Sequence, residues 1–279
     1  MRLSQSGNIV VQFGDSLDDV VRYLRTTPRV WTYNNSKTND YGHRWTFGLD
    51  YEGALELALK GWPDGTDRLA KGVKAMPAPQ AVHHKRQFDV GGDFPDVGRF
   101  VSGQPDCMVR RGRQSGIKPV IHLVIAPMTH SEVTAYEFLT MGTAMALVID
   151  QLEASGRRVE LDVAFYRRLP NGKSLEGWKI KRADEHLDFG ALAFSIAHPA
   201  SVRRLGFALR ERTRYSMQDD DYGHSIPITA EILPLIDAER ALCINIAYSD
   251  CKTTRGAVRS LVNIINNAAG ETIVEADYD

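Results

Sequence analysis

From Lys118 onward, the hydrophobic positions of the chain change between strand-like and helix-like spacing. The run 119–126 is apolar between two prolines, which is typical of a buried strand. A helix is expected after it, capped by Ser131, with apolar residues at helical spacing and Gly156 at its end. Residues 158–166 then alternate apolar and polar, so we expect a second strand and a right-handed β-α-β unit.

The later elements of this half follow the same alternation. We expect a turn at 170–172, a strand at 178–181, helical stretches at 188–197 and 199–215, a strand at 241–248 and a helix at 255–269. Strands that alternate with helices predict an α/β fold, here a three-layer Rossmann-like sandwich over residues 118–270.

The first half, residues 1–117, has fewer regular patterns. Apolar residues at helical spacing predict one helix at 15–24, behind an Asp15 or Ser16 cap. They predict another at 51–60, which Gly61 ends. The rest is rich in aromatic residues, glycine and proline.

We therefore expect an irregular α+β accessory domain over 1–117. Trp45, Phe47 and Trp62 are expected to pack together and close it. The sandwich over 118–270 follows, and the chain ends in an acidic tail over 271–279, which could contact a protein partner or compete for a basic groove.

Composition narrows the class of protein. The 279 residues include 34 Lys and Arg against 35 Asp and Glu, and the net charge of -1 excludes a uniformly basic nucleic-acid binder. Cys107, Cys243 and Cys251 are odd in number and lack C-x-x-C spacing, so we expect reduced thiols and no zinc knuckle. The start of the chain lacks a long apolar segment, which favours a cytoplasmic location in the host cell.

Motifs for phosphate binding are incomplete. Residues 171–174 end like a phosphate-binding loop, but Arg167 stands where its first glycine is required, so we expect a hairpin turn. Gly91-Gly92 lacks the spacing of a dinucleotide-binding loop. At the end of the first strand of the sandwich, Thr129, His130 and Ser131 are expected to be loop and cap residues.

No other set of residues forms a catalytic or metal site that the sequence can identify. His83-His84 would point to opposite faces of a strand, and His122 in an apolar run is expected to be a core histidine. The run 219–221 of three aspartates is expected to be a solvated turn. We therefore expect no metal, no cofactor and no catalytic residue, although enzymatic activity stays open.

Basic residues gather at two places, and these are the candidate nucleic-acid contacts. They are Arg110, Arg111, Arg113 and Lys118 in a glycine-containing loop, and Arg203, Arg204, Arg210, Arg212 and Arg214 on one helix. Phe207 and Tyr215 lie beside the second group, and Trp31, Tyr33, Trp45 and Trp62 are further aromatic candidates. Guanidinium groups pair with phosphates and aromatic rings stack on bases, so the two groups could form one single-stranded-DNA surface. A solvated or salt-bridged helix face and a tryptophan core are the alternatives.

The element order over 118–270 resembles a von Willebrand factor A-like domain. The resemblance includes residues 146–153, followed by Gly156 and a strand. Ala126 stands where that family has its metal-binding aspartate, so the resemblance implies a domain without the metal site.

Several motifs resemble an uncharacterised family of phage-encoded proteins. They are Trp45-Thr46-Phe47-Gly48, Glu52-Gly53-Ala54-Leu55, Gly61-Trp62-Pro63-Asp64-Gly65, Phe88-Asp89-Val90, Gly92-Asp93, Pro95-Asp96-Val97, Gly103-Gln104-Pro105-Asp106-Cys107-Met108 and His198-Pro199-Ala200 before Arg203-Arg204. That family brings no catalytic residues. The chain is also similar to a single-stranded-DNA-binding cofactor of a phage RNA polymerase.

These observations lead to one main hypothesis and two alternatives. The main one is a non-catalytic phage protein that binds single-stranded DNA and contacts a polymerase in transcription or replication. The alternatives are a protein-interaction module on a metal-free α/β domain and a nucleotide-processing enzyme with Asp, His and Arg side chains in one pocket. Self-association is left open.

Overall fold

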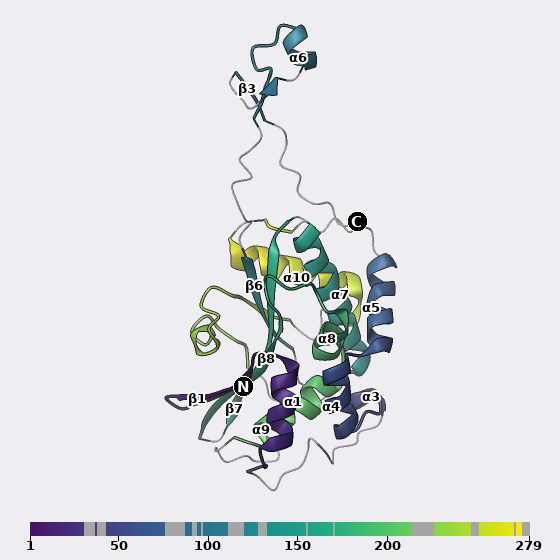
Figure 1. The fold of residues 1–279 in the computed structure, drawn as a ribbon, viewed down its shortest axis with the longest axis vertical. Helices are drawn as coiled ribbons and strands as arrows, with labels where there is room; N and C mark the ends of the chain where they lie inside the picture. Colours follow the sequence, from purple (N-terminus) through teal and green to yellow (C-terminus); the bar gives the residue numbers. More distant parts are fainter. Residues whose placement is uncertain are drawn as a thin grey trace.

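The computed structural model describes most of the chain. The described residues are 1–30, 37, 43–75, 87–90, 94–95, 97–110, 120–127, 133–154, 156–169, 171–213, 226–246, 251–270 and 272–274. They form an α/β body around one large sheet and a small module with a sheet of its own (Figure 1).

The main sheet has six strands in the order β1-β2-β8-β7-β6-β9. Their bounds are β1 Arg2–Ser6, β2 Ile9–Gly14, β6 Val120–Ala126, β7 Arg158–Leu169, β8 Gly172–Lys181 and β9 Leu242–Asn245. β6 is parallel to β7 and to β9, whereas β7 and β8 are antiparallel and form the hairpin expected at 170–172. The sheet is therefore mixed.

The first strands belong to this sheet and not to a separate domain. β2 pairs in parallel with β8, with Val11 opposite Leu175, and β1 pairs with β2 at the edge. Val20 and Leu55, from the early helices, share one core with Phe138 and Leu161 of the α/β half. The core is thus continuous across the boundary predicted at residue 117, and that boundary is wrong for the body of the protein.

The helices of this continuous core cover one face of the sheet (Figure 1). They are α1 Leu17–Thr26, α3 His43–Thr46, α4 Tyr51–Lys60, α5 Pro63–Ala75, α7 Ala135–Ala154, α8 Phe189–Leu192, the π-helical turns η1 Ala193–Ala197 and η2 Ser201–Gly206, α9 Phe207–Arg210 and α10 Thr254–Ala269. α7 is buried around most of its surface, because α5 and α10 pack beside it.

The other face of the sheet is covered by the segment 226–241, which leads into β9. Its 3-10 helix η4, Leu233–Ile236, places Leu233 and Ile236 against Val124 and Tyr166 of the sheet. Asn245 holds the start of the segment, since its side chain accepts from Ile228 N and donates to Ile228 O, at 2.9 Å in each case. This cover is thin compared with the helical layer.

A small module, here called the arm, comprises the described residues from Gln87 to Arg110. β3 Gln87–Asp89 and β4 Phe94–Pro95 pair with the central strand β5 Met108–Arg110, and α6 is Val97–Val101. Figure 1 draws the arm apart from the main sheet, joined to it through residues outside the described ranges. In the sequence, the arm lies between α5 and β6.

Most of the elements expected from hydrophobic spacing are present. Ser16 accepts from Asp19 N as the cap of α1, and Asp50 accepts from Gly53 N as the cap of α4, which ends at Gly61 with φ 76. The α/β class is confirmed, whereas the finer von Willebrand factor A-like arrangement is not. Among the described residues, no helix has the length and apolar character needed to cross a bilayer.

Candidate functional site

The arginines predicted to contact DNA from η2 and α9 are buried. Arg203 and Arg210 are 0% exposed, and Arg204, Arg212 and Phe207 are nearly so. A buried guanidinium cannot meet a phosphate at the protein surface, so this part of the predicted interface is wrong. Arg110 lies in β5, and Arg111, Arg113, Lys118, Arg214 and Tyr215 lie outside the described residues, as do Thr129, His130, Ser131 and Asp219, Asp220 and Asp221.

Arg203 binds the backbone of two other segments. Its guanidinium donates to Trp45 O at 2.8 Å and to Val133 O at 2.6 Å, and it stacks 3.5 Å from the Trp45 ring centre. Burial lowers the pKa of Arg203 to about 9. Trp45 thus makes a cation–π contact with Arg203, whereas Phe47 and Trp62 pack on each other.

Two neighbouring arginines act in the same way. Arg212 donates to Thr27 O at 2.8 Å and to Leu24 O at 2.7 Å, and Arg204 donates to Leu49 O at 3.1 Å. We call Arg203, Arg204 and Arg212 the arginine clamps. They satisfy carbonyl groups at the ends of α1 and α3, just before α4 and just before α7, and so connect these segments to residues 203–212.

Arg210 belongs to a buried ionic group under the sheet. Arg167 Nε lies 3.8 Å from Glu176 Oε2, and all three side chains are fully buried. Burial raises the pKa of Glu176 against the opposing effect of Arg167 and Arg210. The Arg167 guanidinium also lies 5.4 Å from the Phe207 ring centre, which accounts for the burial of that phenylalanine.

Three motif segments meet in an aromatic cluster around His198. The ring centre of His198 lies 4.5 Å from Trp62, 5.5 Å from Phe47 and 5.8 Å from Phe194. Phe47 and Trp62 are themselves 5.7 Å apart, as the sequence predicts. His198 Nδ1 accepts from Ala200 N at 3.1 Å, and burial lowers its pKa to about 3, so the ring is neutral. These motif residues are structural.

An exposed set of basic residues lies on α5, outside the predicted groups. Arg68, Lys71 and Lys74 are exposed at successive three-residue intervals, whereas Leu69 and Gly72 face the core and α7. We call Arg68, Lys71 and Lys74 the basic face. None of them forms an ion pair with another described residue, and α5 lies at the outer side of the helical layer (Figure 1).

In the sequence, the residues that link the basic face to the arm include no acidic residue. No acidic residue stands between Asp67 and Asp89, or between Asp106 and Glu132. The antiparallel pairing of β3 and β5 sets Gln87 opposite Arg110. The next residues outward in the sequence are Arg86 and Arg111, each one peptide bond from this pair. In the sequence, a basic residue therefore stands on each side of the described part of the arm.

The arm also exposes apolar side chains. Phe100 is 65% exposed, Val101 79% and Val90 75%. Arg99, beside them, pairs with Asp106 at 2.7 Å and is thereby fixed on the arm. An exposed aromatic ring is a group on which proteins that bind single strands stack unpaired bases.

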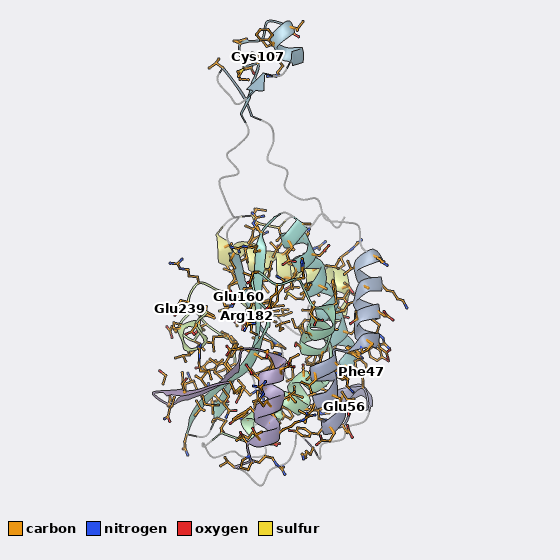
Figure 2. The ribbon with its side chains drawn as sticks, viewed as in Figure 1. Phe47, Glu56, Cys107, Glu160, Arg182 and Glu239 are labelled. Carbon is orange, nitrogen blue, oxygen red and sulfur yellow. The ribbon has the colours of Figure 1, made fainter. Side chains whose placement is uncertain are left out.

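A second polar cluster lies on the thinly covered face of the sheet. His122 Nε2 lies 2.8 Å from Asp162 Oδ2, and Lys179 Nζ lies 3.3 Å from Asp162 Oδ1 and pairs also with Glu160. Burial opposes the charge of Lys179, but Asp162 and Glu160 raise its pKa overall. His122 and the turn 237–240 line a pocket of about 430 Å³. Figure 2 labels Glu160 and Glu239, one on each of these two parts.

The sequence contains only part of the signal for this cluster. The alternation of β7 puts Glu160 and Asp162 on the face opposite Leu161 and Val163, but pairing with β6 and β8 depends on contacts between distant segments. His122, expected in the core, borders the pocket instead. In the part of the chain that the structure describes, no group of three His, Cys, Asp or Glu side chains could hold a metal ion.

Comparisons with known proteins add a family and no activity. No curated protein and no solved structure matches the chain. The model of a domain of unknown function, DUF7192, matches residues 4–267, which include the main sheet, its helical layer and the arm. The chain therefore belongs to the DUF7192 family of domains of unknown function.

Proposed function

We propose that the protein binds single-stranded DNA along the basic face of α5 and the base of the arm. The observation that carries the proposal is the exposure of Arg68, Lys71 and Lys74 without an ion pair to any described residue. Because phosphate contacts release counterions, cations left unpaired by the protein itself are the ones that add affinity. The basic residues before Gln87 and after Arg110 extend this surface.

Single-stranded DNA fits this surface better than a duplex. Phe100 is exposed on the arm, and an unpaired base can stack on its ring, whereas the bases of a duplex are already stacked. The proposal keeps Arg110, Arg111, Arg113 and Lys118 as DNA contacts and replaces the buried arginines with the basic face of α5.

Fluorescence anisotropy with a labelled oligonucleotide tests the proposal. The triple variant Arg68→Gln, Lys71→Gln, Lys74→Gln should bind more weakly, and its salt dependence should be shallower by about 2 in logarithmic slope, roughly 0.7 for each lost contact. The matched control is Arg22→Gln, Arg25→Gln, Lys60→Gln, which removes three exposed charges elsewhere. Equal loss in both triples, or no binding by the wild type at low salt, contradicts the proposal.

A protein partner on the arm is a second candidate, because Val90, Phe100 and Val101 each expose apolar surface there. A polymerase subunit that reads the bound DNA is one such partner. The variant Phe100→Ser, Val101→Ser separates the candidates. If the variant loses DNA binding, Phe100 and Val101 contact DNA. If it still binds DNA but no longer binds the polymerase, they contact the partner protein.

The fold also supports a finer proposal about architecture. β6, α7, β7 and the parallel strand β9 keep the order of a von Willebrand factor A-like unit, and Ala126 at the end of β6 lacks the metal-binding carboxylate. An experimental structure that superposes this unit on such a domain would support the assignment, and a different helix position would contradict it.

A further inference from the structure

The pocket beside His122 has walls from two separate parts of the chain. His122 projects from β6, and the turn 237–240 leads from η4 into β9. Asp237 adopts the left-handed conformation with φ 56, and its carboxylate pairs with Arg2 of the edge strand β1. The turn therefore contacts β1 through an exposed ion pair, and a volume of about 430 Å³ is in the range of small-molecule sites.

Most charges near the pocket are already paired. Asp162 contacts both His122 and Lys179, Glu160 pairs with Lys179, and Asp237 pairs with Arg2. In the described part of the protein, this leaves two exposed wall residues without an ion pair, Glu239 and Arg240. The pocket thus offers one strong acceptor and one strong donor.

Asp162 also determines which ring nitrogen of His122 is left for a ligand. Asp162 is 0% exposed, and its Oδ2 lies 2.8 Å from His122 Nε2. Because a carboxylate only accepts, Nε2 is the nitrogen of His122 that donates in this pair, and Nδ1 is the ring nitrogen left for another partner. His122 Nδ1 makes no hydrogen bond to another described residue, so it is available to a ligand.

We propose that this pocket takes an unpaired nucleobase of the bound DNA strand. A base carries donors and acceptors side by side, which match Glu239, Arg240 and His122, whereas a bare phosphate would match Arg240 alone and would be repelled by the Glu239 carboxylate. His122 is also the third residue of β6, directly after the basic segment that follows Arg110. The inference rests on the proposed function, and it adds recognition of a base to the binding of the backbone.

The test uses fluorescence anisotropy to measure the affinity of the protein for two labelled strands. One is an ordinary oligonucleotide, and the other has the same backbone with an abasic site at every position. The pocket should contribute about tenfold to the preference of the wild type for the base-containing strand, the size of one well-placed set of hydrogen bonds to a base. The double variant Glu239→Gln, Arg240→Gln should lose this tenfold contribution, keep the part due to stacking on Phe100, and keep the affinity for the abasic strand. The control Glu231→Gln, Arg255→Gln changes two exposed charges of the same signs elsewhere and should keep the preference.

The outcomes separate this inference from the proposed function. Equal affinity of the wild type for both strands, or a preference in the Glu239 and Arg240 variant as large as that of the wild type, overturns the inference while DNA binding stands. If the wild type binds neither strand, the proposed function fails, and titration with free deoxynucleosides decides the inference. Shifts of the His122 ring signals in NMR that are absent from the double variant support it, and unchanged signals overturn it.

Discussion

The arginine clamps and the basic face of α5 are similar in composition and opposite in environment. Arg203 is 0% exposed and donates to Trp45 O and Val133 O, whereas Arg68, Lys71 and Lys74 are exposed without an ion pair to any described residue. A buried guanidinium stabilises the fold by satisfying carbonyl groups, and an exposed one is free to attract a polyanion. Local charge density alone therefore does not identify a binding surface.

The largest expected effect is the loss of a clamp. Arg203→Gln should destabilise the protein by about 3 kcal/mol or more, because two buried carbonyl groups lose charge-assisted hydrogen bonds. Urea unfolding followed by tryptophan fluorescence measures it. If Arg203→Gln is as stable as the wild type and loses DNA affinity, Arg203 belongs with the exposed group and the comparison is wrong.

The loss of a side chain from the aromatic cluster around His198 is expected to have the next largest effect on stability. Trp62→Ala should lower the free energy of unfolding by about 3 kcal/mol, since the ring packs on His198 and Phe47. Gly65 adds to this packing, because a Cβ there would lie 2.1 Å from the Trp62 ring. Thermal melting measures the loss. An unchanged melting temperature with reduced DNA affinity would assign Trp62 to binding.

The pH dependence of stability reports on the same cluster. His198 has its pKa lowered to about 3 by burial, so the unfolded chain binds the extra proton first as the pH falls. The stability contributed by neutral His198 is full above about pH 6.5 and is lost between there and about pH 3, by at most about 1.4 kcal/mol per pH unit. His198→Gln should remove this part of the slope in urea unfolding at several pH values. A slope equal to that of the wild type would mean that His198 is solvated.

The smallest expected effect on stability belongs to the basic face. Lys71→Gln should change the free energy of unfolding by no more than about 0.5 kcal/mol, because the side chain is exposed and unpaired among the described residues. The same urea titration checks it. A loss as large as that of Arg203→Gln would show that α5 also uses its basic residues to hold the fold.

Local signals in the sequence were sufficient for the helices and for part of the sheet. Ser16 and Asp50 cap α1 and α4, and Gly61 ends α4, because capping depends on neighbouring residues. The β7–β8 hairpin follows from the turn residues at 170–172. The pairing of β2 with β8 joins residues far apart in the chain, and no local pattern specifies it.

The candidate sites were harder to predict for the same reason. Arg203 and Arg68 stand in similarly basic stretches, and only the packing of η2 against Trp45 and Val133 shows which of the two is buried. Asp162 follows an apolar alternation that predicts its face, but its contact with His122 needs the register of β6 and β7. Side-chain environment is thus set by tertiary contacts.

The most direct test is the salt dependence of oligonucleotide binding by two proteins, the wild type and the variant with glutamine at positions 68, 71 and 74. Binding that weakens steeply with salt for the wild type, and less steeply for an equally stable variant, is the predicted result. Superimposable salt titrations for the two proteins would contradict the assignment of α5 to the DNA surface.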